Sequence, residues 1–510
     1  MASELKAGTI FNFISIVVRL VVGFTMTPYM IYCLGENNFG LFSIAGGILA
    51  YLSLMDFGLG PTVTKYVAES VAKQDTAAES RLIGQSVYLF SLLGILFALV
   101  AAVLYFFLGD LYGDKLTVTE FSDLQWMYIL MVANTALFFP ARAFAGVLTA
   151  HQKFKIPGTV GLVHSLLNVG VTFLLLWLGY GPVALVLAGV LLSTINSLWN
   201  CWYCLRLVSS PIVFGKPDFS IFKSMIRYSL GIFINQLYDL VNWQLGPIIL
   251  GATAGTSAVA VYRVGMQIPN IYMSLPWAVS GVLFAKMVGM ATLGVSPREL
   301  TLQMVRVARI QSFIVFISLL GFLLYGREFM HLWVGESLGA QTNEAWLISI
   351  ILMVALLIPL LQSLGITVVQ AYNLNYYKAG LLCLTTPVTI VLAFWLSLLG
   401  GASGFAWATA ISGIGLSVFL VNVFLYKRRL RLHLLLFFRE TLRGCYLPLI
   451  CTVLSAFAIE YMLRGLPPGW FLFSLKCALL LLIYSTSMWF LWASPEERTM
   501  IFSLVKRRKG

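Results

Sequence analysis

The sequence predicts an all-α, polytopic integral membrane protein with about 14 transmembrane helices. Three observations predict this class. Of the 510 residues, 60% are hydrophobic and only 10% are charged, whereas a soluble globular protein carries roughly 25% charged residues. The mean hydropathy is +0.90. Apolar runs of about 20 residues, each long enough to cross about 30 Å of hydrocarbon, recur along the whole chain. This composition excludes a soluble enzyme, a DNA-binding module and a disordered scaffold.

The apolar runs and the Gly, Pro and charged breakers between them define the predicted helices in chain order. Their ranges are 7–32, 39–67, 82–108, 124–150, 156–179, 181–206, 221–250, 256–288, 300–326, 345–372, 376–399, 402–426, 440–463 and 469–493. The longest outer connections, near 109–123 and 327–344, are too short for a soluble catalytic domain. Within helix two, the run from Phe57 to Pro61 predicts an interruption, because it contains two glycines and a proline.

The basic residues fix the expected orientation. With the N-terminus inside, the outer connections hold only Lys115, Arg327 and Arg464, while the inner ones hold runs such as 427–431. Positive residues concentrate on the cytoplasmic side of inner-membrane proteins. We therefore expect a multi-pass protein of the bacterial inner (cytoplasmic) membrane with both termini cytoplasmic. The basic tail 506–509 is expected to contact anionic membrane lipids, and no nucleic-acid partner is expected.

Two similar turns indicate an internal repeat. Leu34-Gly35 ends the first helix and Leu250-Gly251 ends the seventh, and each is followed by a short polar turn and an aromatic residue. Six helices separate the two turns, which predicts a 6+6 pseudo-repeat around a central cavity with two extra C-terminal helices. The expected units are an N-terminal lobe over 1–215, a C-terminal lobe over 216–431, and helices 13 and 14 with the basic tail over 432–510.

Polar residues inside the predicted spans are the candidate functional residues, because polar groups are costly in lipid and must face protein or a water-filled cavity. They recur at helical spacing on four helices. These residues are Asn12 and Arg19 on the first helix, Asp56 on the second, Asn235 and Asp239 on the seventh, and Arg263, Gln267 and Asn270 on the eighth.

Four polar faces, two from each half, favour a shared substrate cavity. For the amides and hydroxyls, the alternative is that they join helices by hydrogen bonds. Arg19 and Arg263 need a stronger reason, because an arginine at membrane depth costs about 2.5–3.5 kcal/mol. Either they form ion pairs, Arg19 with Asp56 and Arg263 with Asp239, or they bind an anion such as a diphosphate. The two alternatives are compatible in different states of the protein.

Arg142 and Lys65 lie near cytoplasmic helix ends. Their side chains are expected to reach the lipid headgroups, and they are also candidates for attracting an anionic headgroup that enters from the inside. Lys476 lies outside the repeat, and we interpret it as structural. The seven cysteines lie mostly in apolar segments, so neither a disulfide framework nor a metal site is expected.

The N-terminal region resembles the polysaccharide transporter family. The resemblance rests on the Leu34-Gly35 turn with Phe39-Gly40, the run 54–60 (LMDFGLG) and the run 65–69 (KYVAE). These motifs lie within roughly residues 5–70 and are similar to those of Wzx-type flippases of lipid-linked oligosaccharides, in the multidrug/oligosaccharidyl-lipid/polysaccharide exporter superfamily. The remaining chain agrees with this family in its span count, 6+6+2 layout and basic inner loops.

The resemblance implies two six-helix lobes that alternate access to a central cavity. It also implies a substrate, an undecaprenyl-diphosphate-linked oligosaccharide that moves from the cytoplasmic to the periplasmic leaflet for O-antigen (lipopolysaccharide), capsule or exopolysaccharide assembly. Implied partners are the polysaccharide polymerase and the chain-length machinery. No cofactor is expected. Asp56 and Asp239 leave open whether H+ or Na+ drives the cycle.

Two alternative functions share this expected fold: a cation-coupled multidrug exporter and a peptidoglycan lipid flippase. A third alternative is a membrane enzyme, such as a polysaccharide polymerase or glycosyltransferase. The sequence contains no phosphate-binding Gly-rich motif, nucleophile elbow or His-rich metal pattern. We therefore predict a transporter and not an enzyme.

Overall fold

The computed structural model describes the backbone of residues 2–151, 155–207, 213, 218–283, 287, 289–290, 293–372 and 374–492. Side chains are described within these ranges, except at 2–21, 72, 155–157, 207, 228, 231, 235, 275, 278, 279, 281 and 282. Every regular element in the described ranges is a helix. This confirms the predicted all-α class.

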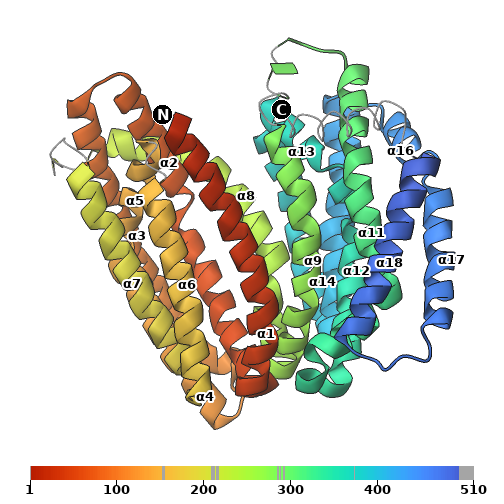
Figure 1. Ribbon diagram of the computed structural model, residues 1–510. Coiled ribbons are helices and arrows are strands. Elements are labelled where there is room, and N and C mark those ends of the chain that lie inside the picture. The colour runs from red at the N-terminus through yellow and green to blue at the C-terminus, as the bar shows by residue number, and fades with distance from the viewer. Residues whose placement is uncertain are drawn as a thin grey trace. The chain divides into compact units, whose positions relative to one another are not determined.

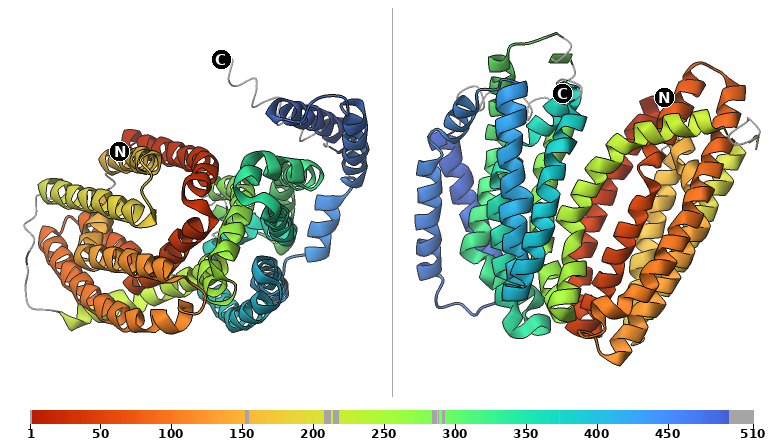
Figure 2. Two further views of the ribbon diagram at one scale, coloured as in Figure 1. Left: turned by 90° about the horizontal axis from the view of Figure 1, so that it is seen from below. Right: turned by 180° about the vertical axis from the view of Figure 1, so that it is seen from behind.

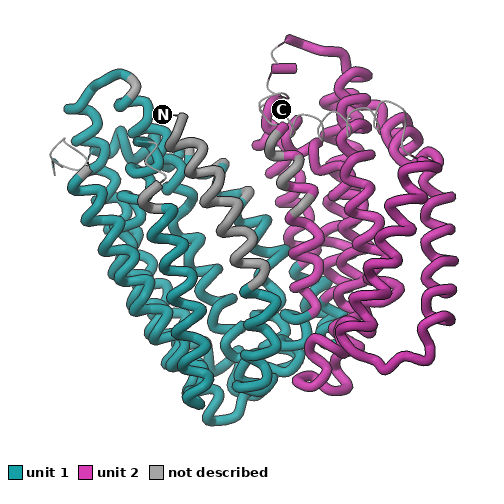
Figure 3. The backbone as a smooth tube through the Cα atoms, viewed as in Figure 1, with its two compact units in different colours: residues 1–264, 390–405 teal, residues 265–389, 406–510 magenta. Residues whose placement is uncertain are grey.

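The chain divides into two compact units (Figure 3). Unit 1 comprises residues 1–264 and 390–405, and unit 2 comprises residues 265–389 and 406–510. The predicted N-terminal lobe ends at residue 215, whereas Phe219–Thr253 (α8) packs against other helices of unit 1. The two units are defined by packing, whereas the predicted lobes are defined by an internal repeat. The units therefore do not test the 6+6+2 layout, which stays a prediction.

Unit 1 is a bundle of long helices joined by short connections (Figure 1). In chain order these are α1 (Ala2–Ser53), the short η1 (Leu54–Asp56), α2 (Leu59–Ala72), α3 (Thr76–Tyr112), α4 (Val118–Phe138), α5 (Ala141–Ala150), α6 (Lys155–Trp177), α7 (Pro182–Leu207) and α8 (Phe219–Thr253). Helix α1 packs against α6 on one side and α8 on the other (Figures 1 and 2). Residues 255–264 of α9 (Gly255–Val282) complete the unit, together with residues 390–405 of α14.

Unit 2 holds residues 265–282 of α9 and the C-terminal helices, except residues 390–405 of α14. These are α11 (Pro297–Leu338), η2 (Gly339–Gln341), α12 (Thr342–Leu361), α13 (Ser363–Ala371), α14 (Asn375–Ala408), η3 (Thr409–Leu416), α15 (Ser417–Leu420), η4 (Val421–Arg429), α16 (Leu434–Leu442), α17 (Tyr446–Met462), α18 (Trp470–Ser487) and η5 (Met488–Trp492). Its buried core includes Met304, Leu364, Tyr426 and Phe437.

Many of the helices are long and apolar enough to cross a membrane. Within the described part of the chain seven meet this criterion, or up to nine if each of two bent pairs forms one span. Three of the seven are 50, 65 and 55 residues long and run through a helix break. The chain is therefore a multi-pass membrane protein by length and composition, and the count of fourteen stays a prediction.

The interruption predicted in the second helix is confirmed. Phe57 (φ 49°) and Gly58 (φ 72°) adopt left-handed backbone conformations, and α2 begins at Leu59. A Cβ at Gly58 would lie 2.9 Å from Cγ2 of Ile232 on α8, whereas a Cβ at Gly60 would meet no atom within 4 Å. Position 58 therefore requires glycine twice over, for its backbone angle and for its close approach to α8.

The prediction of an outer connection over 327–344 is wrong for most of this range. Helix α11 continues to Leu338 and ends where Gly339 takes a positive φ of 52°. Arg327 Nε donates to Asn343 Oδ1 at 2.8 Å, and His331 Nε2 lies 3.3 Å from the same oxygen. The charged pair at 327–328 is typical of the end of a span, but no proline occurs between it and Gly339, and the helix continues through Gly335.

Three charges connect the last two helices to the rest of unit 2. The Nζ of Lys476 on α18 lies 2.9 Å from a carboxylate oxygen of Glu328 on α11 and 2.9 Å from one of Glu460 on α17. The lysine side chain is only 6% exposed. A cation this buried requires paired carboxylates, so the triad fixes α17 and α18 against α11.

Candidate functional site

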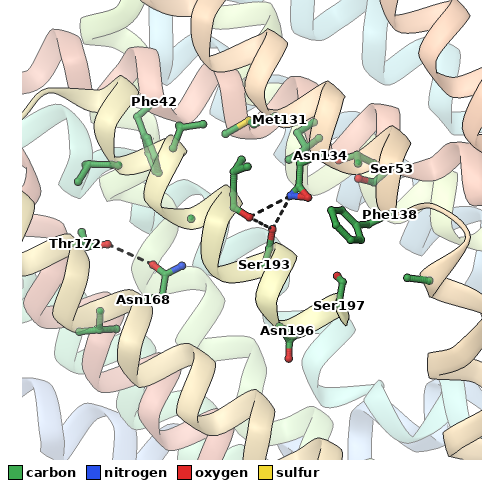
Figure 4. A pocket seen from close by; sticks show the side chains of 18 of the residues that line it. Phe42, Ser53, Met131, Asn134, Phe138, Asn168, Thr172, Ser193, Asn196 and Ser197 are labelled. Atoms are coloured by element: carbon green, nitrogen blue, oxygen red, sulfur yellow. Dashed lines mark hydrogen bonds between the residues drawn. The ribbon is translucent and has the colours of Figure 1, made fainter. Parts of the chain in front are cut away.

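Unit 1 contains a partly open cavity of about 650 Å³ between α1, α4, α5, α6 and α7 (Figure 4). Its wall combines an apolar majority with ten polar side chains, which is the usual composition of a small-molecule pocket. The polar lining residues are Ser53, Asn134, Thr135, Arg142, Asn168, Thr172, Ser193, Asn196, Ser197 and Asn200.

Four of these residues lie on one face of α7. Ser193, Asn196, Ser197 and Asn200 are spaced at i, i+3, i+4 and i+7, so a regular helix turns all four toward the same side. Along an apolar helix, such a polar face is expected to point into protein or into a cavity and not into lipid. The cavity therefore follows from the local sequence of α7.

Asn134 joins α4 to α7 across the cavity wall. Its Nδ2 donates to Ser193 Oγ at 2.7 Å and to the Val190 carbonyl oxygen at 3.4 Å (Figure 4). Thr194 Oγ1 donates to Asn134 Oδ1 at 3.4 Å. These bonds occupy both ends of the amide. Asn134 is therefore a structural member of the wall, which holds α7 in place.

The other amides keep hydrogen-bonding capacity. Thr172 donates to Asn168 Oδ1 at 3.3 Å, and Asn200 Nδ2 donates to Asn196 Oδ1 at 3.5 Å. These two bonds use the amide oxygens of Asn168 and Asn196 and the amide nitrogen of Asn200. Within the described part of the chain, the Ser197 hydroxyl has no hydrogen-bond partner. The cavity thus offers donors and acceptors to a polar ligand.

One ion pair lies at the cavity wall. Arg142 Nη1 is 3.4 Å from Asp56 Oδ2, and the same nitrogen lies 3.4 Å from the carbonyl oxygen of Ser53. The guanidinium carbon lies 4.8 Å from the ring centre of Phe139. Asp56 Oδ1 accepts from the backbone N–H of Gly58 at 2.9 Å. The side chains of Arg142 and Asp56 are 34% and 22% exposed.

Two local breaks bring this pair together. Asp56 lies in the turn that separates α1 from α2, where Phe57 and Gly58 reverse the sign of φ. Arg142 follows Pro140, where the chain bends by 54° between α4 and α5. Helices α2 and α5 then pack along each other. The sequence predicts Arg142 near a helix end, and it predicts Asp56 as an ion-pair partner of Arg19 or as a residue that couples the cycle to H+ or Na+.

Arg263 and Lys65 take other partners. Arg263, on α9, is half-buried and its Nη2 donates to Gln244 Oε1 of α8 at 3.4 Å. Asp239 is exposed on α8, and its expected ion pair with Arg263 stays a prediction. Lys65 Nζ lies 3.9 Å from Glu69 Oε1, and both side chains are largely exposed, so this pair contributes little stability.

The remaining candidates cannot be assigned to this cavity. Asn12, Arg19 and Asn235 lie outside the residues whose side chains are described. Gln267 is half-buried and Asn270 is exposed, and both lie in the part of α9 that belongs to unit 2. The roles expected for these five residues in substrate binding stay predictions.

Sequence reasoning missed the polar face of α7 and Asn134. Ser193, Asn196 and Asn200 have the same helical spacing as the polar residues that the sequence identifies on four other helices. The polar face of α7 could therefore be predicted from the sequence. Asn134 is isolated in α4, and only the packing of α4 against α7 reveals its role. In the described part of the chain, no group of three or more His, Cys, Asp or Glu residues is placed to hold a metal ion.

The sequence of the chain matches a known protein family. A family model described as "Polysaccharide biosynthesis protein" matches residues 5–284. That range includes every helix that lines the cavity. A probable flippase of Haloferax volcanii, AglR, is 23% identical over 415 residues, which cover 80% of this chain and 81% of the relative. A putative O-antigen transporter of Shigella flexneri is 19% identical over 68% of this chain and 80% of the relative.

Solved structures with a similar fold are also membrane transporters. The lipid II flippase MurJ, in an inward closed conformation, has a TM-score of 0.71 and 14% identity, covering 95% of this chain and 98% of the other. An inward-facing multidrug resistance transporter of the MATE family has a TM-score of 0.57 and 15% identity, covering 81% and 98%. The named relatives are transporters and flippases, in agreement with the prediction that this chain is not an enzyme.

Proposed function

The chain belongs to the polysaccharide biosynthesis protein family, and we propose that it is a membrane flippase for a lipid-linked oligosaccharide. The family match over residues 5–284 is the observation that carries this proposal. The names of the relatives, a probable flippase and putative O-antigen transporters, support it. The cavity of unit 1 supports it too, because a carbohydrate that crosses a membrane needs polar partners in place of water.

The proposed substrate is an undecaprenyl-diphosphate-linked oligosaccharide. It moves from the cytoplasmic to the periplasmic leaflet by alternating access, and the product feeds O-antigen, capsule or exopolysaccharide assembly by a polymerase and its chain-length partners. The proposed location is the bacterial inner membrane with both termini cytoplasmic, which the basic inner loops support. An H+ or Na+ gradient is the proposed energy source.

A peptidoglycan lipid flippase is the second candidate. The structural similarity to MurJ, at a TM-score of 0.71 over 95% of this chain, favours it. This similarity concerns the fold alone, since the identity is only 14%. The two candidates differ in their carbohydrate, so an experiment that identifies the accumulating lipid separates them.

The test is deletion of the gene in its host, with quantification of polyprenyl-diphosphate-linked oligosaccharide and surface polysaccharide by mass spectrometry. We expect the lipid intermediate to accumulate while surface polysaccharide disappears, and the wild-type gene on a plasmid to reverse both changes. Accumulation of a peptidoglycan precursor would favour the second candidate. Unchanged lipid intermediates with new sensitivity to cationic drugs would contradict both and favour a multidrug exporter.

Arginine variants test whether an anionic group is bound. We expect Arg19→Ala and Arg263→Ala to abolish surface polysaccharide with normal amounts of protein in the membrane. Lysine at either position should restore little activity, because an ammonium cannot reproduce the bidentate guanidinium fork. Arg464→Ala, at an exposed position, is the control. Normal polysaccharide in both alanine variants would exclude these arginines as ligands.

A further inference from the structure

We propose that the cavity of unit 1 binds the uncharged sugar residues of the lipid-linked oligosaccharide and not its diphosphate. The inference rests on the proposed function and assigns one part of the substrate to one set of residues. It follows from three properties of the cavity: its charge, its spare hydrogen-bonding groups and its apolar surface.

The charge of the cavity does not suit a diphosphate. Arg142 is the one charged residue among the described side chains that line it. Asp56, 3.4 Å away, already neutralises that guanidinium. A diphosphate would enter with its negative charges uncompensated, and an unpaired charge in a partly desolvated site is expensive. An uncharged ligand avoids this cost.

A coupling cation fits the cavity no better. Hard cations such as Na+ and Mg2+ favour carboxylate and carbonyl oxygens. No carboxylate occurs among the described residues that line the cavity, and Asp56, which pairs with the lining residue Arg142, also accepts a hydrogen bond from the Gly58 amide. The described part of the wall therefore suits a polar ligand without net charge.

The spare hydrogen-bonding groups suit hydroxyls. Nδ2 of Asn168, Nδ2 of Asn196, Oδ1 of Asn200 and the Ser197 hydroxyl are left unused by the hydrogen bonds described for the wall. They offer both donors and acceptors, and a sugar hydroxyl is itself a donor and an acceptor. Amide side chains bind such groups without the desolvation cost of a full charge.

The apolar part of the wall suits the carbon faces of sugar rings. Phe42, Met131 and Phe138 line the same cavity as the polar face of α7 (Figure 4). Flat aromatic surfaces pack well against apolar C–H groups, and a pyranose ring presents C–H groups on its faces and hydroxyls at its edge. The volume of about 650 Å³ lies within the size range of small-molecule pockets.

Two independent changes test the assignment. Asn196→Ala with Asn200→Ala removes two amides that face the cavity. Gly189→Leu instead fills the cavity and leaves the amides in place, since a Cβ at Gly189 would meet only Asn168 Nδ2, at 3.9 Å. Leucine has a better helix propensity than glycine, so this variant is expected to fold.

Each change has a matched control. Gly170→Leu makes the same substitution at an exposed position of α6, where a Cβ meets nothing within 4 Å. Asn37→Ala removes an exposed amide outside the cavity. Thermal unfolding of the purified full chains verifies that all variants fold.

The measurement is the dissociation constant of the purified full chain, in detergent, for two probes. The first probe is the lipid-linked oligosaccharide extracted from host cells that lack the gene. The second is undecaprenyl diphosphate, which carries the same lipid and diphosphate without sugar. We expect both cavity variants to bind the first probe about tenfold more weakly, equivalent to about 1.4 kcal/mol, with little change for the second. The control variants should match the wild type with both probes.

Three results would overturn the assignment. Cavity variants that bind the first probe as tightly as the wild type would show that the sugar does not bind in this cavity, while the flippase function would stand. An equal loss of affinity for both probes by variants that fold normally would place the lipid diphosphate there instead. A wild-type chain that binds neither probe would contradict the proposed function itself.

Discussion

The ion pair between Arg142 and Asp56 allows a quantitative prediction. The perturbation is a double-mutant cycle of Asp56→Asn, Arg142→Met and the double variant. Asparagine keeps an oxygen that can accept from the Gly58 N–H, now 2.9 Å from Asp56 Oδ1, so the first change removes the charge and preserves the turn. Methionine keeps most of the aliphatic length of arginine, so the second change removes the guanidinium with little loss of packing.

The magnitude follows from the distance and the exposure of the pair. Two unit charges 3.4 Å apart attract each other by about 5 kcal/mol at an effective dielectric constant of about 20. Water screens much of this attraction, because the two side chains are 34% and 22% exposed. The pair lies between exposed pairs, worth about 0–1 kcal/mol, and buried pairs, which cost about 3–5 kcal/mol to break. We expect a coupling energy of about 1–2 kcal/mol.

The assay is reversible unfolding of the purified chain in mixed micelles, with the free energy of unfolding extrapolated for all four proteins. Each single variant should be destabilised, because each leaves one charge without its partner. The double variant should lose less than the sum of the two single losses. A coupling energy below about 0.3 kcal/mol, the usual limit of additivity, would refute the ion pair and with it the claim that the described side chains of the cavity wall include no free cation.

Three further predictions concern stability. Gly58→Ala should lower the free energy of unfolding by about 2 kcal/mol, because its φ is 72° and the new Cβ meets Ile232; Gly60→Ala is the control, and equal losses at both positions would contradict this. Lys476→Met should cost about 3 kcal/mol by leaving two carboxylates unpaired, and neutralising both carboxylates as well should recover stability in the same unfolding assay. Hydrogen bonds from the Ser220 side chain and backbone lower the pKa of Asp218 at the start of α8, so the stability it contributes at neutral pH should disappear as the pH falls through that lowered pKa. Thermal unfolding of the Asp218→Asn variant between neutral and acidic pH should lack this component, and an unchanged pH profile would contradict the assignment.

The fold class could be predicted because composition determines it. A chain with 10% charged residues and recurring apolar runs has no water-soluble alternative. Local breaks could be predicted where Gly and Pro cluster, as at Phe57 to Pro61. The end of α11 could not, because Arg327 and Glu328 resemble a membrane boundary although no residue there breaks the helix.

The candidate site was harder to predict because it depends on packing between distant segments. Arg142 and Asp56 are 86 residues apart, and they meet only because α5 bends away from α4 and packs on α2. Helical spacing identifies a polar face within one helix, such as the face of α7. It does not identify which other helix supplies the partner, so the sequence predicts Arg19 as the ion-pair partner of Asp56 and does not identify Arg142.

The central claim is that the chain moves a lipid-linked oligosaccharide across a membrane. The most direct test reconstitutes the purified chain in liposomes that contain the lipid extracted from the deletion host. A membrane-impermeant oxidant that modifies only outward-facing glycan reports the orientation of the lipid. Under an imposed H+ or Na+ gradient, vesicles with the chain should expose glycan beyond the outer-leaflet fraction that protein-free vesicles show. An exposed fraction equal to that of protein-free vesicles under every gradient would contradict the account.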